Sequence, residues 1–455
     1  MKAAYFRLPL AAGTRARHLR LMAFLAPQWA RSQGVVVSPY RTKVPLSMSA
    51  RVDRQRRALQ ATLDFELPLY ETPQVSVIVP VHDQLAFTLD CLKSIALSAP
   101  ATPFEVLVVD DASQETTREA LGGIKGLRLI SHSENEGFIR SCNTGAQAAK
   151  GQYLLFLNND TVVMPGWLDT LVETFAQIPG TGLVGSRLVF PDGTLQEAGC
   201  LIWQDGTPWM IGRFQDADLP AYHYAREVDY CSGASLMIPR TLFDELGGFD
   251  THYCPAYCED ADLGLKVRQH GYRVIYQPFS TVIHWEGMSN GRSTHTGVKA
   301  WQTINIQKFR KRWSGQLNTQ GEGPAGFDRA KDRTMKGRAL FLTADLPQDA
   351  LTLQQQGFQV TWFPGDGLEP CDPRIENLQR RGVEVLYRPF EPSAERHLKH
   401  QGSRYQYVVL GEEAVATAQV ARRYCPQAQI VQPSALADMD RQRPAPESPL
   451  IPAHV

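Results

Sequence analysis

The sequence predicts an α/β protein built on a mixed, mainly parallel sheet, and two observations carry that prediction. Short apolar or β-branched runs alternate with helical patterns from residue 75 to residue 157. Such alternation is typical of βαβ units, whose strands run parallel. Acidic and amide residues follow several of the apolar runs. Ligands of open α/β sheets bind outside the carboxyl ends of strands, so these residues stand where a substrate would lie.

The expected elements follow one another along the chain. For the first unit we expect strands and intervening helices at Val75–Pro80, Leu85–Leu97, Phe104–Val109, Ser113–Leu121, Leu127–Ser131, Phe138–Ala149 and Tyr153–Leu157. Less regular elements follow at Trp167–Gln177, Gly182–Phe190, Tyr230–Pro239, Ala261–His270, Tyr272–Tyr276 and Thr281–Trp285. A second series is expected at Arg338–Thr343, Gln348–Gln356, Phe358–Phe363, Asn377–Arg381, Val383–Tyr387, Tyr407–Leu410 and Ile430–Val431.

The length and composition suit a soluble globular protein of more than one domain. A chain of 455 residues predicts roughly two to four domains, and 43% hydrophobic residues can form a large core. We expect a basic N-terminal arm over 1–72, an α/β domain over 73–313, a linker over 314–335, a second α/β unit over 336–440 and a disordered tail over 441–455.

The net charge of zero hides a basic N-terminus. Residues 1–60 hold twelve Lys and Arg side chains and one acid, Asp53, which gives this arm a net charge of about +11. Such an arm suits an anionic membrane surface or an acidic partner, and a solvated helical extension is the alternative. No apolar run reaches the ~18 residues of a membrane span. The eight scattered cysteines fit a reducing cytosol. We therefore expect a cytoplasmic protein that the arm can bring to the inner face of the membrane.

The strand Tyr153–Leu157 ends in Asn158, Asn159 and Asp160. A carboxylate at the carboxyl end of a strand is a hard oxygen ligand that suits Mg²⁺ or Mn²⁺ bound to phosphates. The alternative is an ordinary strand followed by an Asx turn.

More acids follow other expected elements. Asp110 and Asp111 follow the second strand, and the acids Glu259, Asp260 and Asp262 open a later helix. Like charges in one cleft repel unless a cation compensates them, and a divalent ion bound to a nucleoside diphosphate would do so. Helix capping remains an alternative for Asp111 and Asp260. His284 ends an apolar run, where a histidine is more often part of the core.

Taken in order, eight segments resemble the inverting family 2 glycosyltransferases, which have the GT-A fold. They are Val75–Asp83, Val108–Ser113, Asn135–Phe138, Asn143–Gly145, Leu157–Asp160, Gly247–Asp250, Glu259–Leu263 and Val282–His284. The resemblance covers residues 75 to about 313 and is greatest to the bacterial branch that builds lipopolysaccharide O-antigen and other surface glycans, including rhamnosyltransferase-like members. It implies a GT-A nucleotide-diphospho-sugar transferase fold.

The resemblance also implies roles for individual residues. The donor nucleotide would be bound by Pro80, Asp83, Asp110, Asp111, Asn135, Asn158 and Asn159. Asp160 and His284 would hold the metal, Mn²⁺ or Mg²⁺. Asp260 would be the general base, with Glu259 beside it, and sugar or acceptor contacts would come from Gly233, Ala234 and Trp285, with Trp203 and Trp209 as further candidates. The sequence departs from the family pattern at Asn158, where the metal motif usually begins with an acid.

The segment from Lys336 to about Asp440 resembles the N-terminal, Rossmann-like half of a GT-B glycosyltransferase. In that fold the donor nucleotide binds mainly to the other half. The resemblance therefore implies an acceptor-binding or vestigial unit.

The sequence thus predicts a metal-dependent hexosyltransferase. It would move a sugar from a UDP-sugar or dTDP-rhamnose to a hydroxyl of a growing cell-surface glycan or lipid-linked glycan, with no role for nucleic acid. Two alternatives remain at this point: a nucleotidyltransferase, and a non-catalytic carbohydrate-binding scaffold.

Overall fold

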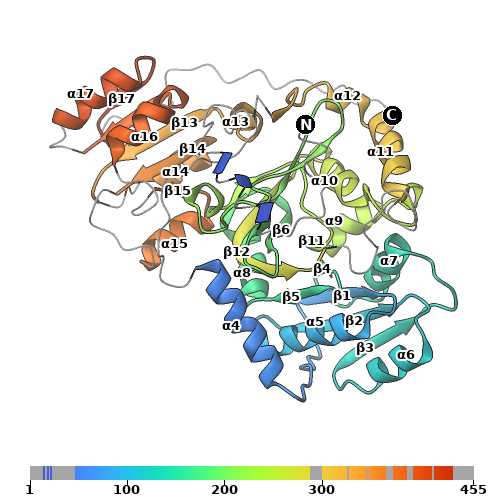
Figure 1. Ribbon diagram of the computed structural model, residues 1–455. Coiled ribbons are helices and arrows are strands. Elements are labelled where there is room, and N and C mark those ends of the chain that lie inside the picture. The colour runs from blue at the N-terminus through green and yellow to red at the C-terminus, as the bar shows by residue number, and fades with distance from the viewer. Residues whose placement is uncertain are drawn as a thin grey trace. The chain divides into compact units, whose positions relative to one another are not determined.

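The computed structural model describes residues 14–15, 18–19, 21–22, 47–286, 300–324, 327–345, 347, 349–364, 372–386, 393–411 and 415–433. The chain forms two compact units (Figure 1). The first unit runs to Thr334 and also contains Glu376–Gly382, and the second comprises Met335–Ile375 and continues from Val383. The expected tail, 441–455, lies outside the described residues.

The first unit is built on a ten-stranded mixed sheet. Its central order is β10-β12-β6-β11-β4-β1-β2-β3, with β5 paired to β12 and β7 to β6. The strands are β1 (Val75–Val81), β2 (Phe104–Asp110), β3 (Leu127–Ser131), β4 (Tyr153–Leu157), β5 (Thr161–Val163), β6 (Thr181–Val189), β7 (Leu195–Glu197), β10 (Arg226–Glu227), β11 (Ser235–Pro239) and β12 (Arg273–His284). A separate hairpin joins β8 (Cys200–Ile202) to β9 (Pro208–Met210).

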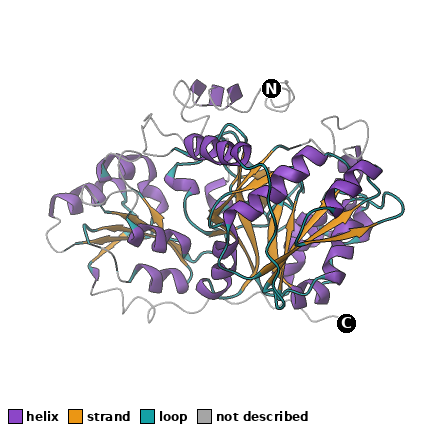
Figure 2. Cartoon of the chain, turned by 90° about the horizontal axis from the view of Figure 1, so that it is seen from below, coloured by secondary structure: helices purple, strands orange, loops and turns teal. Residues whose placement is uncertain are grey.

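Helices cover the strands of this sheet, as Figure 2 shows. They are α4 (Met48–Ala61), α5 (Leu85–Ser98), α6 (Glu115–Gly122), α7 (Phe138–Ala148), α8 (Trp167–Gln177), α9 (Arg240–Glu245), α10 (Glu259–Gln269), α11 (Trp301–Arg312), α12 (Ser314–Leu317) and α13 (Phe327–Ala330). None of the helices in the described part of the chain is long and apolar enough to cross a membrane.

The parallel strands β1, β2 and β4 fix the position of the candidate site. Val75 pairs with both Phe104 and Tyr153, so the three strands start level and end at one edge of the sheet. Their side chains are buried on both faces, which is why these strands read as continuous apolar runs. The predicted α/β class, with its mixed sheet and parallel βαβ part, is confirmed.

Two differences from the expected elements have local causes. The two expected strands on either side of Pro278 form the single strand β12, whose pairing with β6 shifts register between Gln277 and Thr281. Pro278 has no N–H to donate to the ladder, which favours a bulge there. The stretch expected as a linker contains α12 and α13, and its Arg333 is paired with the buried Asp229 of the first unit.

The second unit is a five-stranded, all-parallel sheet in the order β15-β14-β13-β16-β17. The strands are β13 (Gly337–Leu342), β14 (Phe358–Phe363), β15 (Glu384–Val385), β16 (Tyr407–Leu410) and β17 (Gln429–Val431), and the helices are α14 (Ala350–Gln355), α16 (Ala394–Gln401) and α17 (Val415–Tyr424). The helix α15 (Pro373–Arg380) is divided between the two units at Glu376. The strand order is that of a Rossmann-like unit, as the sequence predicted. The sequence analysis missed α16 and α17.

Candidate active site

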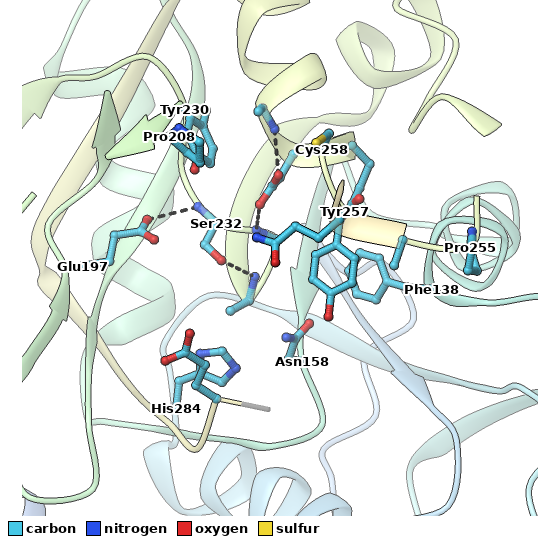
Figure 3. A pocket seen from close by; sticks show the side chains of 18 of the residues that line it. Phe138, Asn158, Glu197, Pro208, Tyr230, Ser232, Pro255, Tyr257, Cys258 and His284 are labelled. Atoms are coloured by element: carbon cyan, nitrogen blue, oxygen red, sulfur yellow. Dashed lines mark hydrogen bonds between the residues drawn. The ribbon is translucent and has the colours of Figure 1, made fainter. Parts of the chain in front are cut away.

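A cavity of about 640 Å³ in the first unit opens at the edge where β1, β2 and β4 end (Figure 3). Its lining includes residues after these strands, the start of α10, the 231–234 segment before β11, the strand β7 and the helix α11. Most of the site residues expected from the sequence meet here: Pro80, Asp111, Asn135, Asn158, Asn159, Asp160, Gly233, Ala234, Glu259, Asp260 and His284.

Asp111 is held rigidly at the start of α7. Its carboxylate accepts hydrogen bonds from the backbone N–H groups of Glu136 and Gly137, both at 2.8 Å, and lies 3.0 Å from Nδ1 of His132. Asp111 therefore binds the N-terminus of α7. The sequence analysis had considered Asp111 as a cap of a different helix, the one that directly follows it in the sequence. Gly137 has a φ of +87°, and a Cβ there would lie 2.7 Å from Pro255, so only glycine fits.

Three of the expected residues lie outside the cavity lining. Asp110 is fully buried and accepts a hydrogen bond from the Ser113 N–H at 3.2 Å, so it stabilises the turn after β2. Asp83 accepts a hydrogen bond from the Gln114 N–H at 2.9 Å and likewise links two loops. Trp285 packs its ring 6.0 Å from Phe87. The further candidates Trp203 and Trp209 pack against each other, at 5.9 Å between ring centroids.

Asp160 and His284 are brought together by strand pairing. The strand β5 pairs antiparallel with β12, opposing Thr161 to His284. As a result, Nε2 of His284 lies 3.3 Å from Oδ1 of Asp160, and both side chains are buried. Burial lowers the pKa of His284, but the attraction of Asp160 outweighs it, so the pKa is raised above its ordinary value.

A carboxylate facing an imidazole is a donor set that fits a divalent cation. No group of three or more His, Cys, Asp or Glu side chains suited to a metal occurs among the described residues. Two protein ligands still suffice for a Mg²⁺-like ion, which usually keeps waters and substrate phosphates as its other ligands. Beside them, Oδ1 of Asn158 is buried and has no hydrogen-bond partner within the described structure. An acceptor of this kind, lining the cavity, suits a cation or a hydroxyl donor.

Glu259 and Asp260 begin α10 and differ in their partners. Asp260 accepts hydrogen bonds from the N–H groups of Gly233, at 3.2 Å, and Ala261, at 2.8 Å. Oε2 of Glu259 is buried and has no hydrogen-bond partner in the described parts of the chain. Burial, with repulsion from Asp260, raises the pKa of Glu259 to about 8. Burial also raises the pKa of Asp260, although its two N–H donors oppose this. Glu259 is therefore the member of the pair that holds a proton at neutral pH, and the two N–H donors favour the charged form of Asp260.

Glu197 is a third acid in the cavity, and the sequence analysis did not find it. It ends β7, is 4% exposed and accepts a hydrogen bond from the Ser232 N–H at 3.1 Å. Burial raises its pKa to about 7. No sequence pattern predicted a role for Glu197, because β7 is only three residues long and the neighbours of Glu197 come from distant segments. The cavity is also lined by Gln196, Arg213 and Glu286, which the sequence analysis likewise did not predict.

Asp262, the last acid of the expected cluster, does not line the cavity. Its Oδ1 accepts hydrogen bonds from Trp313 Nε1 at 2.9 Å and Tyr253 Oη at 3.2 Å, and Lys266 lies 2.9 Å from Oδ2. It therefore anchors α10 to neighbouring segments.

Comparison with known proteins agrees with this arrangement. Residues 76–246 match the family model described as Glycosyl transferase family 2. The matched segment contains the strand ends at Asp111 and Asp160, whereas Asp260 and His284 lie beyond it.

Three curated relatives are similar to the chain. An uncharacterized protein, y4gI of Sinorhizobium fredii, is 29% identical over 54% of the chain and 28% of its own length. The O-antigen biosynthesis protein RfbC of Myxococcus xanthus is 34% identical over 49% of the chain and 18% of its own length. An N-acetylglucosaminyl-diphospho-decaprenol L-rhamnosyltransferase of Mycobacterium tuberculosis is 28% identical over 49% of the chain and 80% of its own length. The chain thus spans less than a third of the first two relatives.

Proposed function

We propose that the protein is a metal-dependent, inverting glycosyltransferase. It would transfer a sugar from a nucleotide diphosphate donor, a UDP-sugar or dTDP-rhamnose, to a hydroxyl of a growing cell-surface glycan. The supporting observation is that one cavity is lined by Asp111, by the Asp160–His284 pair and by Asp260. A nucleotide site, a cation site and a base are the three parts that this reaction needs.

The donor would lie along the edge of the sheet. Asp111 offers a fixed carboxylate to the hydroxyls or base of the nucleoside, with Pro80 and Asn135 close by in the same lining. Asp160 and His284 would hold Mn²⁺ or Mg²⁺, which supplies positive charge to the departing diphosphate. Oδ1 of Asn158 is available to a hydroxyl of the donor or to a water, and no acid is required at that position.

Asp260 would act as the general base. Its carboxylate takes the proton of the acceptor hydroxyl while that oxygen attacks the anomeric carbon. The bond from this carbon to the diphosphate breaks in the same displacement, and the diphosphate leaves with the electron pair, which inverts the anomeric centre. The Gly233 N–H orients the carboxylate, and Glu259, which is protonated at neutral pH, adds no second charge.

The relatives' names support a proposal for the acceptor and its location. One relative is named for O-antigen biosynthesis and another for a decaprenol-linked acceptor, so we propose a glycan or lipid-linked glycan made at the cytoplasmic face of a membrane. The helix α4 supports contact with such a surface, because it exposes Arg54, Arg56 and Arg57.

A donor screen tests this function. The full chain is incubated with UDP- and dTDP-sugars, with and without Mn²⁺, and release of the nucleoside diphosphate is followed. We expect slow, Mn²⁺-stimulated hydrolysis of one donor. The proposal fails if no donor is turned over and no nucleotide binds in a metal-dependent way.

A further inference from the structure

Gln196 joins the candidate metal site to an ion pair at the cavity wall. Its Oε1 lies 3.0 Å from Nδ1 of His284, and its Nε2 donates a hydrogen bond to Oε2 of Glu286 at 3.3 Å. The same carboxylate oxygen accepts a hydrogen bond from Arg213 at 2.6 Å. Gln196 is 3% exposed, so solvent does not compete for these contacts.

Glu286 fixes which end of the Gln196 amide faces His284. If the amide were turned round, its oxygen would face the carboxylate of Glu286, and two acceptors would repel each other. Arg213 keeps Glu286 in place, and its guanidinium stacks 4.7 Å from the ring of Phe214 and 5.3 Å from the ring of Phe190. The amide oxygen must therefore be the atom that faces the histidine.

An oxygen that can only accept requires a proton on Nδ1 of His284. When a cation is bound, the other ring nitrogen, Nε2, which lies 3.3 Å from Asp160, must then be the one that gives up its proton. This is the form of imidazole that ligates a metal through Nε2. The amide thus selects the tautomer that the cation site needs.

The backbone directs Gln196 to this position. Along the antiparallel pair β6–β7, Leu188 pairs with Glu197 and Val189 with Leu195, so Gln196 is the extra residue at a register shift. A bulge re-aims a side chain, and bulges often occur next to active sites. The strand β6 also pairs with β12, which ends in His284, so the bulge brings Gln196 within reach of that ring.

We propose that Gln196 is a positioning residue that fixes the tautomer and orientation of His284 for binding a divalent cation. This inference rests on the proposed function, since it assumes that Asp160 and His284 form the cation site. Beyond the proposed function, we infer that the Gln196 amide, which does not bind the cation itself and is held by Glu286, sets the affinity of the cation site.

Direct Mn²⁺ binding tests the proposal without relying on turnover. The full chain is titrated with Mn²⁺ in the presence of UDP, and separately dTDP, while free Mn²⁺ is measured by electron paramagnetic resonance. We expect Gln196→Met, which keeps the length of the side chain but offers no amide, to weaken Mn²⁺ binding roughly 10–100-fold. The exchange Gln196→Glu/Glu286→Gln keeps an oxygen toward Nδ1 and places an amide donor opposite it, so this double variant should remain within about 3-fold of the unmodified chain.

A matched control separates positioning from general damage. Gln277 is a 1% exposed glutamine on β12 that donates to Thr174 and lies outside the cavity lining, so Gln277→Met should leave Mn²⁺ affinity unchanged. As a second readout, ¹⁵N-histidine NMR with Mg²⁺ and UDP present should show His284 with its proton on Nδ1 in the unmodified chain and a mixture of tautomers in Gln196→Met. His284→Gln identifies the signal.

The outcomes separate the two proposals. If the unmodified chain binds no Mn²⁺ with either nucleotide, the proposed function fails. If it binds Mn²⁺ but Gln196→Met binds equally well, or the exchange Gln196→Glu/Glu286→Gln is as weak as Gln196→Met, the positioning role is wrong and the function stands.

Discussion

Glu197 and Asp260 accept hydrogen bonds from consecutive backbone amides. The Ser232 N–H donates to Glu197 at 3.1 Å and the Gly233 N–H donates to Asp260 at 3.2 Å. Two acids from distant segments are thus tied to one short loop before β11. The loop fixes where Asp260 points, and any change that moves the loop should change the base as well.

Replacing the base should separate chemistry from binding. Asp260→Asn keeps the size of the side chain but cannot take a proton, so we expect transfer to fall about 10²–10⁴-fold. Nucleotide affinity, measured by calorimetry with Mn²⁺ present, should change less than about 3-fold, because the expected nucleoside contacts lie at Asp111. Asp244→Asn on the exposed face of α9 is the control. Survival of transfer in Asp260→Asn would show that the base is misassigned.

Asp260 should set the acidic limb of the pH–rate profile. The base works only as a carboxylate, so activity falls as the pH drops through the pKa of Asp260, which burial raises above its usual range. Glu259, whose pKa is about 8, is already neutral in the acidic limb. Glu259→Gln therefore removes no charge beside the base and should leave the acidic limb in place without abolishing transfer. The measurement is kcat against pH from 5 to 8, and an acidic limb that moves to lower pH in Glu259→Gln would show that Glu259 is charged there.

Burial of Glu197 should make the first unit less stable at higher pH. Its pKa is about 7 in the folded protein and 4.5 in a model peptide. The stability linked to the bound proton is therefore complete below the unfolded pKa and is lost as the pH rises through about 7. Glu197→Gln does not titrate, so its free energy of unfolding relative to the unmodified chain should rise between pH 5 and pH 8 by on the order of 2–3 kcal/mol. Urea unfolding at several pH values measures this, and a constant difference would contradict the assigned pKa.

The parts of the site that the sequence revealed are those that follow a local pattern. Asp111 comes directly after the buried strand β2, and Asp160 follows β4 after two amides. Parallel strands end at one edge of the sheet, so the meeting of these two acids could be predicted. By the same rule we expected Asp110 among the residues that bind the donor nucleotide. Successive side chains at a strand end, however, point to opposite sides. Asp110 is turned into the protein, where it accepts a hydrogen bond from Ser113.

Residues placed by tertiary pairing could not be predicted. Gln196 and Glu197 lie on a three-residue strand, and their positions depend on a register shift against β6. The role of Glu286 depends on Arg213, which is distant in the sequence. The fold was easier to predict, because alternating strands and helices repeat along the chain. The antiparallel insertion of β11 between β4 and β6 left no comparable trace.

A methyl group on Gly185 should disturb the loop that holds both acids. A Cβ at Gly185 would lie 2.2 Å from Cβ and 2.5 Å from Sγ of Cys231, which is closer than real atoms approach. The strand β6 cannot yield easily, because Gly185 pairs with Leu236 on one side and Tyr276 on the other. The 231–234 loop must therefore move, taking with it the amides that orient Glu197 and Asp260.

We expect Gly185→Ala to cost about 1–3 kcal/mol of stability, as overpacking usually does, and to lower kcat more than Mn²⁺ affinity. The control is Gly315→Ala, where an added Cβ meets nothing within 4 Å. In the double variant Gly185→Ala/Cys231→Gly the clashing Cβ and Sγ are absent, so kcat should recover. Comparing kcat and Mn²⁺ affinity across these variants tests the idea. A Gly185→Ala protein with unchanged kcat, or a double variant without recovery, would show that the 231–234 loop does not control the base.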